Sequence, residues 1–257
     1  MKHALDAAAP LLLAKCRREG VLADLPLHEF SSRAEAEQFQ LDALKALGGT
    51  FCGYKIGATS LEIQQFLNCR APIYAPIRRE DMLAGGASFM IPAGLFGVEC
   101  EYGFLMGEDF PAAGEALNIA VLRSRIAECF MALELVGRRV VAGVPLNEAS
   151  AIADFGLDVA VVHGASIPDW EARDLATMPV RAVLDGRPVA EGNGAMVLGH
   201  PLNALLWLAQ ALHQRGNKLR TGDMILTGAC CGITKVAAGQ TFAGCFADFP
   251  PLQIQFV

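Results

Sequence analysis

The stretch Gly97-Val98-Glu99-Cys100-Glu101-Tyr102-Gly103-Phe104 places two carboxylates one residue apart inside an apolar run. Side chains of a β-strand point alternately to opposite faces, so Glu99 and Glu101 share one face and Cys100 points to the other. Two like charges side by side in an apolar setting repel each other unless one takes up a proton or a cation lies between them. The alternative interpretation is an edge strand with one solvated acidic face.

A third acid lies in another apolar stretch, where Glu134 is embedded in residues 131–136 (MALELV). An acid in the middle of a buried strand is rarely without a function, because burying an unpaired charge is costly. Three carboxylates with no histidine or cysteine on the same face favour a hard divalent cation, Mg²⁺ or Mn²⁺, over zinc.

Composition narrows the class of protein. The 257 residues allow one large domain, or a main domain with a small helical appendage. A hydrophobic content of 53% predicts a sizeable core, and a net charge of -6 without a Lys/Arg cluster argues against nucleic-acid binding. The eight cysteines contain no CxxC pair, which favours reduced thiols and a cytoplasmic location. Residues 7–13 (AAAPLLL) are interpreted as part of an amphipathic helix, and no apolar run approaches the length of a membrane span.

Two helices are expected before residue 50 and mostly strands after it. The first helix covers residues 4–19, and the second follows a capping box at Ser32 to Glu35. We therefore expect a helical N-terminal part, 1–49, and a β-rich metal-binding catalytic domain, 50–257. A second capping box, Thr59 to Glu62, opens a short helix, and further helices are expected at 115–130, 147–154 and from 201 to Gly216. Strands are expected at 50–58, 73–74, 88–91, 98–106, 131–140, 159–163, 180–184, 188–191, 223–227, 240–246 and 252–257. For residues 131–140 a continuation of the preceding helix is the alternative. The predicted class is α+β with peripheral helices.

Two further sites carry candidate functional groups. Lys55 lies in the strand at 50–58, where it is either a surface lysine, which its spacing alone favours, or a cation held near the metal site. Thr227-Gly228 follows a strand and is either a simple turn or a source of backbone N–H groups for a carboxylate. The five histidines form no ligand spacing, and GxSxG, Walker and GxGxxG motifs are absent from the sequence.

The ordered set of motifs resembles the fumarylacetoacetate hydrolase superfamily, in particular its 2-keto-4-pentenoate hydratase and 4-oxalocrotonate decarboxylase branch. The resemblance extends from about residue 4 to the end of the chain. It rests on residues 53–60 (GYKIGATS), Glu99-Cys100-Glu101, Ala132 to Leu135, Gly192 to Gly194, Leu198 to Pro201, Ala204 to Leu212 around Trp207, 219–228 (LRTGDMILTG) and Ala238-Gly239.

The resemblance implies a rolled, mixed β-barrel with a small helical N-terminal part, and Mg²⁺ or Mn²⁺ held by Glu99, Glu101 and Glu134. It implies a catalytic role for Lys55, and substrate contacts from Thr59, Ser60, Thr227 and Gly228. The implied substrate is a 2-hydroxy-2,4-dienoate or 2-oxo acid, as in aromatic compound catabolism by meta-cleavage. The implied reaction is hydration to a 4-hydroxy-2-oxo acid, by a homo-oligomer without nucleic-acid or membrane partners.

Three positions and one segment depart from the pattern of this branch. Ile73 replaces an Asp that takes part in proton transfer, Cys100 replaces a Pro, Gly137 replaces an acid, and residues 153–157 (ADFGL) lack a polar Asn and Ser. A 2-oxo acid decarboxylase or an acylpyruvate-type C–C hydrolase is therefore the second hypothesis. The hydrolase would need a water-activating His/Glu pair, and His28-Glu29 is the nearest candidate. A non-catalytic relative is the third hypothesis.

Overall fold

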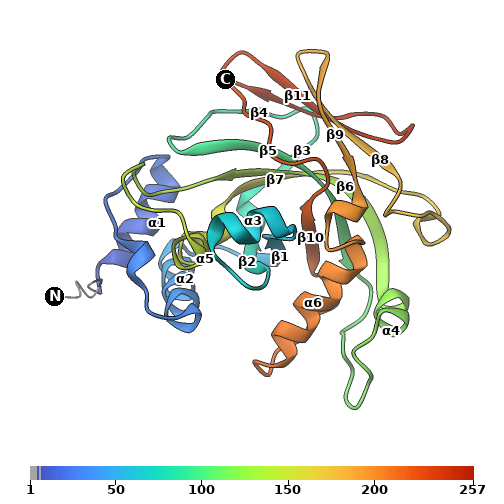
Figure 1. Ribbon diagram of the computed structural model, residues 1–257, viewed down its shortest axis with the longest axis horizontal. Helices are drawn as coiled ribbons and strands as arrows, with labels where there is room; N and C mark the ends of the chain where they lie inside the picture. Colours follow the sequence, from blue (N-terminus) through green and yellow to red (C-terminus); the bar gives the residue numbers. More distant parts are fainter. Residues whose placement is uncertain (1–4, 6) are drawn as a thin grey trace.

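Two β-sheets and six α-helices form the part of the chain that the computed structural model describes, residues 5 and 7–257 (Figure 1). The seven-stranded sheet has the order β2-β1-β10-β5-β6-β7-β3, and the five-stranded sheet has the order β4-β12-β11-β8-β9. The strands are β1 (Phe51–Gly57), β2 (Ile73–Arg78), β3 (Met82–Ala84), β4 (Ser88–Phe89), β5 (Leu95–Met106), β6 (Ile126–Gly137), β7 (Asp158–Ser166), β8 (Pro179–Leu184), β9 (Arg187–Asn193), β10 (Met224–Ala229), β11 (Thr241–Phe246) and β12 (Leu252–Phe256).

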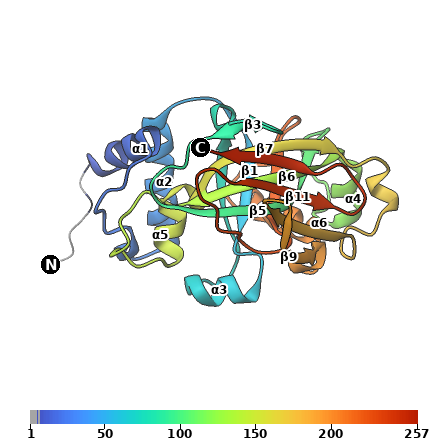
Figure 2. The ribbon, with the colours of Figure 1, turned by 90° about the horizontal axis from the view of Figure 1, so that it is seen from above.

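The helices lie at the two ends of the curled seven-stranded sheet. Figure 2 shows α1 (Ala9–Glu19), α2 (Arg33–Leu47) and α5 (Glu148–Ala153) at one end, and α4 (Ile119–Ser124) and α6 (Pro201–His213) at the other. The short helix α3 (Leu61–Leu67) stands apart at the margin of the molecule in the same view. The expected α+β class with peripheral helices is confirmed, and the sheet forms a half-barrel.

The two faces of β5 have different environments. Cys100, Tyr102 and Phe104 are fully buried in the main core, which also contains β11, β12 and α6 residues. The rings of Tyr102 and Phe246 meet at 5.5 Å between their centroids, edge to face. The opposite face of β5 carries Glu99 and Glu101, as the strand alternation predicts.

A second core joins the N-terminal helices to the rest of the chain. Apolar residues of α1 and α2, including Leu13 and Leu44, pack with Ile152 of α5 and with Val140. Arg17 of α1 also forms a buried ion pair with Asp158, the first residue of β7, at 2.5 Å. The helical part at 1–49 therefore contacts both α5 and the seven-stranded sheet. Residues 4 and 6 of the predicted first helix lie outside the described residues.

The predicted helix at 115–130 is wrong in most of its length. Only Ile119–Ser124 is helical, and Ile126 already begins β6. Residues of β6 pair with β5 from Ile126 opposite Met106 to Gly137 opposite Leu95. This long antiparallel pairing, with burial of Cys129 and Phe130, overrides the local helical pattern. The three-residue strand β3 gives no local sequence signal, because it is formed by pairing with β7, a strand that is distant in the sequence.

Two smaller expectations also need correction. The N-cap of α3 is Ser60, whose side chain accepts a hydrogen bond from Ile63 N at 3.3 Å, and not Thr59 of the predicted capping box. Residues Gly194–His213 are long and apolar enough, by length and composition, to cross a membrane, contrary to the expectation that no run approaches that length. Seven residues of α6 are buried against the rest of the protein, so core packing accounts for the apolar character of this helix.

Candidate metal centre

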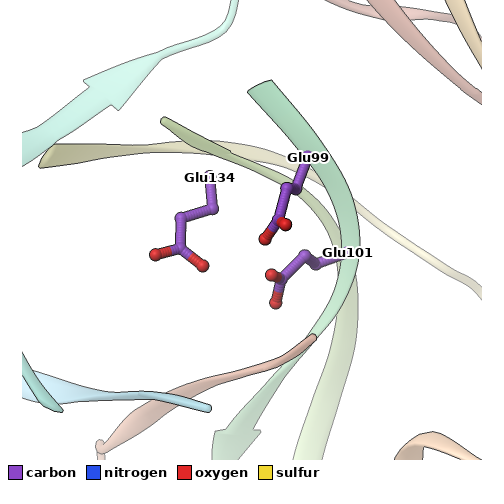
Figure 3. Close-up of side chains that lie close together, drawn as sticks. All are labelled: Glu99, Glu101 and Glu134. Atoms are coloured by element: carbon purple, nitrogen blue, oxygen red, sulfur yellow. The ribbon is translucent and has the colours of Figure 1, made fainter. Parts of the chain in front are cut away.

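Three carboxylates converge on one point at the concave face of the curled sheet (Figure 3). Glu99 lies directly opposite Glu134 in the β5–β6 register, and Glu101 is two residues further along β5. One oxygen from each carboxylate lies within 4.8 Å of the others. Like charges directly opposite each other destabilise a sheet, so this arrangement calls for a compensating cation.

The two fully buried carboxylates each leave an oxygen without a hydrogen-bonding partner. Glu101 Oε2 accepts a hydrogen bond from Gly228 N at 2.7 Å, whereas Glu101 Oε1 has no such partner. Glu134 Oε1 lies 2.8 Å from Lys55 Nζ, whereas Glu134 Oε2 has no such partner. Buried acceptors in this state fit a hard divalent cation such as Mg²⁺, which prefers oxygen ligands. Glu99, Glu101 and Glu134 could therefore hold such an ion.

Burial also sets the protonation of this cluster. Burial raises the pKa of Glu101 well above its ordinary value, and the charges of Glu134 and Glu99 raise it further. Burial raises the pKa of Glu134 and of Glu99 too, against the opposing effect of Lys55. Without a metal ion the three carboxylates therefore tend to retain protons, and a bound metal ion would displace these protons.

Lys55 is the buried cation of the site. Its strand β1 lies between β2 and β10, not at an edge, and the residue is 3% exposed. Burial lowers the pKa of Lys55, but the carboxylates of Glu134 and Glu99 raise it by more, so the net pKa is raised. The interpretation of Lys55 as a surface lysine, which its spacing favoured, is wrong. Its ammonium group stays charged beside the carboxylate cluster.

A backbone carbonyl provides the second contact of Lys55. Its Nζ donates to Gly156 O at 2.9 Å. An ammonium group has three N–H donors, so the contacts with Glu134 and Gly156 leave one for a ligand. Sequence reasoning missed Gly156, because a backbone carbonyl is present in every residue and gives no side-chain signal.

The segment that carries Gly156 is held by buried arginines. Phe155, Gly156 and Leu157 all have positive φ, between 55° and 68°. The Phe155 ring lies under the guanidinium groups of Arg17 and Arg139, at 4.8 and 5.4 Å from its centroid. Arg139 Nε also donates to Asp154 Oδ1 at 2.6 Å, and Arg139 Nη2 donates to Asp154 O. These contacts hold three residues in a conformation that non-glycine residues rarely adopt.

Three of the four residues predicted to contact the substrate line a cavity, and the fourth does not. Thr59 and Ser60 line a cavity next to the carboxylates, together with Gly228. Gly228 has φ +115°, and a Cβ there would meet Thr59 Oγ1 at 2.2 Å, so only glycine fits. Thr227 is fully buried, and its hydroxyl donates to Tyr102 O at 2.8 Å. The structure therefore brings Thr59, Ser60 and Gly228 to the cavity but does not place Thr227 in its lining.

The cavity has a volume of about 290 Å³ and opens beside Glu99 and Lys55. Its polar lining also includes Glu62 of α3, and most of the remaining wall is apolar. Ile73 lines this wall and is 2% exposed. A Cβ on Gly57 would lie 3.3 Å from Ile73 Cγ1 and 3.4 Å from Lys55 Nζ, so both side chains lie over the same face of Gly57.

Comparison with known proteins agrees with this geometry. Residues 61–256 match the family described as fumarylacetoacetate (FAA) hydrolase C-terminal. The TodF product hydratase of Pseudomonas putida is 32% identical over 241 residues, 90% of this chain and 87% of the relative. The 2-keto-4-pentenoate hydratase of Paraburkholderia xenovorans is 33% identical over 200 residues, 77% of this chain and 72% of the relative.

A solved structure has the same fold over almost the whole chain. The 4-oxalocrotonate decarboxylase from Pseudomonas putida G7, complexed with magnesium and adipate, is 22% identical and superimposes with a TM-score of 0.87 over 99% of both chains. The match of the family over most of the chain, together with these relatives, identifies the protein's family. The chain belongs to the fumarylacetoacetate hydrolase family.

Proposed function

We propose that this protein is a divalent-metal-dependent hydratase that adds water to a 2-hydroxy-2,4-dienoate and gives a 4-hydroxy-2-oxo acid. The observation that carries the proposal is the cluster of Glu99, Glu101 and Glu134 beside the charged Lys55, with Glu99 and Lys55 lining a small cavity. Relatives named 2-keto-4-pentenoate hydratase and 2-hydroxyhexa-2,4-dienoate hydratase support the same reaction class.

Different residues of the site would bind the metal ion, transfer a proton and orient the substrate. When bound, the divalent cation supplies positive charge that would stabilise an enolate of a 2-oxo acid. Glu99, Glu101 and Glu134 would hold that ion, and Gly228 N–H fixes the orientation of Glu101. The remaining N–H of Lys55 would donate to a substrate oxygen or return a proton to carbon during ketonisation. The hydroxyls of Thr59 and Ser60 line the same cavity and would orient the substrate.

The test follows the absorbance of the dienol. Purified protein with Mg²⁺ is expected to remove the absorbance of 2-hydroxypenta-2,4-dienoate faster than the spontaneous reaction, and EDTA is expected to abolish the effect. Mn²⁺ would support the same rate enhancement if oxygen ligands alone select the metal. Absence of any metal-dependent loss contradicts the proposal.

A decarboxylase is the second candidate, because the acid expected at position 73 is an isoleucine and the same enolate forms when CO₂ leaves. Mass spectrometry of the product separates the two reactions, since hydration adds one water and decarboxylation removes one CO₂. The acylpyruvate-type hydrolase has less support, because His28 Nδ1 is buried without a hydrogen-bonding partner and neither His28 nor Glu29 lines the cavity.

The non-catalytic alternative is tested with Glu101→Gln. The amide oxygen of Gln can still accept from Gly228 N, while the charge that would hold the metal is lost. Loss of activity in this variant, with a thermal transition in EDTA no lower than that of the wild type, assigns the activity to this chain. We further propose a cytoplasmic homo-oligomer, and light scattering of the purified protein tests its oligomeric state.

A further inference from the structure

The cavity next to the carboxylates has an uneven charge distribution. Lys55 is the sole cation among the described residues that line it, and Lys55 is already in contact with Glu134 and Gly156. The two other charged groups of the lining, Glu99 and Glu62, are both acidic. The cavity therefore offers no second cation to an anionic group that lies away from the three carboxylates.

Most of the remaining lining is built from apolar side chains of several elements. Ile63 and Leu67 come from α3, Phe96 from β5, and Ile233 from the loop after β10, with Ile73 and Leu157 completing the wall. Leu67 and Ile73 are each 2% exposed, so these side chains are fixed by packing. The guanidinium carbon of Arg138 lies over the Phe96 ring, 5.8 Å from its centroid, but Arg138 is not part of the cavity lining.

We infer that the substrate is a 2-oxo or 2-hydroxydienoic monocarboxylic acid whose far end is uncharged and apolar, and that the protein discriminates against dicarboxylic acids of the same length. This inference rests on the proposed function, because it takes the first carboxylate to bind beside the three-glutamate cluster. It specifies the part of the substrate that the cluster does not contact.

The discrimination follows from desolvation. A methyl or vinyl end that enters the apolar wall gains the free energy of burying apolar surface. A second carboxylate at the same place would lose water without gaining a second cationic side chain from the lining, and it would lie in the field of Glu62.

A matched pair of unreactive ligands tests the inference independently of turnover. Isothermal titration calorimetry in excess Mg²⁺ compares 2-oxohexanoate with 2-oxoadipate, which have the same six-carbon chain and differ in a terminal methyl or carboxylate group. We expect 2-oxohexanoate to bind at least about tenfold more tightly, since the diacid has to bury an unpaired charge. Equal affinity, tighter binding of 2-oxoadipate or binding of neither ligand overturns the inference.

A pair of variants on α3 tests the charge argument. Ile63 is 38% exposed and lines the cavity, so Ile63→Lys would place a cation at its wall without burying a charge. The matched control Leu61→Lys adds the same charge to the same helix at a 77% exposed position outside the lining. We expect Ile63→Lys to tighten 2-oxoadipate by about threefold or more and Leu61→Lys to leave it unchanged. The same response in both variants contradicts the inference.

Turnover separates the inference from the proposed function. If the dienoate is not hydrated while 2-oxohexanoate still binds in preference to 2-oxoadipate, the proposed reaction is wrong and the assigned ligand class stands. If the five-carbon dienoate is hydrated but the diacid binds equally well, the reaction stands and the inference is wrong.

Discussion

Lys55 Nζ lies 2.8 Å from Glu134 Oε1, although their strands β1 and β6 are separated in the sheet by β10 and β5. Neighbouring strands are about 5 Å apart, so a flat sheet would hold these two backbones about 15 Å from each other. The curl of the sheet shortens this path across its concave face (Figure 1). The site therefore depends on the curvature of the sheet as much as on the identity of its residues.

Replacement of Lys55 by methionine tests the role of this contact in stability. Lys55→Met keeps much of the side-chain volume but leaves Glu134 without its buried cation. We expect the metal-free protein to lose about 3 kcal/mol of unfolding free energy, the lower end of the cost of breaking a buried ion pair. Urea denaturation in EDTA measures this loss.

Addition of Mg²⁺ to the same variant distinguishes a structural role of Lys55 from a catalytic one. A cation at the three carboxylates would replace part of the lost positive charge, so Mg²⁺ is expected to restore much of the stability but not the activity. Lys235→Met, at an exposed position, is the control and is expected to leave stability and activity unchanged. Full activity of Lys55→Met in Mg²⁺ would remove this lysine from the mechanism.

The raised pKa of Glu101 predicts how stability responds to pH. Glu101 ionises near its ordinary pKa of 4.5 in the unfolded chain, while burial and the charges of Glu134 and Glu99 raise its pKa in the folded protein. Between these two pKa values the folded state holds more protons, so metal-free stability falls as pH rises through this range. Metal binding needs the ionised carboxylates, so stabilisation by Mg²⁺ is expected to grow with pH.

Differential scanning fluorimetry at about pH 5.5 and about pH 8, with EDTA or Mg²⁺, measures this effect. Metal at 100 times its dissociation constant stabilises by about 2.7 kcal/mol, so the shift in Tm is readily detected. Glu101→Gln is expected to reduce the shift at both pH values. A Mg²⁺-induced shift that is larger at the lower pH would contradict the assignment of the carboxylates.

Strand alternation is a local rule and predicts part of the carboxylate cluster, whereas the place of Glu134 opposite Glu99 depends on the β5–β6 register and is implied by the family resemblance. One residue between Glu99 and Glu101 places them on one face, and the apolar surroundings of Glu134 predict a buried strand. The burial of Lys55 could not be predicted in the same way, because it depends on a curl that brings together strands distant in the sheet. The local pattern of residues 126–130 predicts a helix, but their pairing with β5 outweighs this local preference.

The conformation around Gly156 makes a third prediction. Gly156 has φ +63°, and a Cβ there would lie 2.8 Å from Ala75 Cβ and 3.4 Å from Lys55 Cδ. Gly156→Ala is therefore expected to cost more than the roughly 1–2 kcal/mol of a left-handed alanine, and to reduce kcat by displacing Lys55. Urea denaturation and steady-state kinetics measure the two effects.

Gly186 provides the matched control. It lies in the β8–β9 hairpin turn with φ +76°, and a Cβ there would have open space. Gly186→Ala is expected to show the backbone cost alone, with unchanged kcat. Equal losses of stability and activity in both variants would mean that the contact with Lys55 does not matter.

His200 makes the fourth prediction, at the start of α6. Its Nδ1 accepts a hydrogen bond from Leu202 N at 3.0 Å, so the folded state needs this nitrogen unprotonated. Burial lowers the pKa of His200 below 6.5, with a smaller lowering effect from Arg123 and an opposing one from Asp174. The unfolded chain therefore binds a proton more readily, and this residue makes stability fall as pH drops below 6.5 through the folded pKa.

His200→Asn isolates this effect, because asparagine is a good N-cap that does not titrate in this range. We expect the variant to match the wild type within about 1 kcal/mol near neutral pH, and to lose less stability than the wild type between about pH 6.5 and pH 5. His213→Asn, at the exposed C-terminal end of the same helix, is the control and is expected to leave the wild-type acid slope in place. An acid slope that persists in His200→Asn would show that other groups cause it, since the cap itself would still be present while its proton-binding nitrogen is gone.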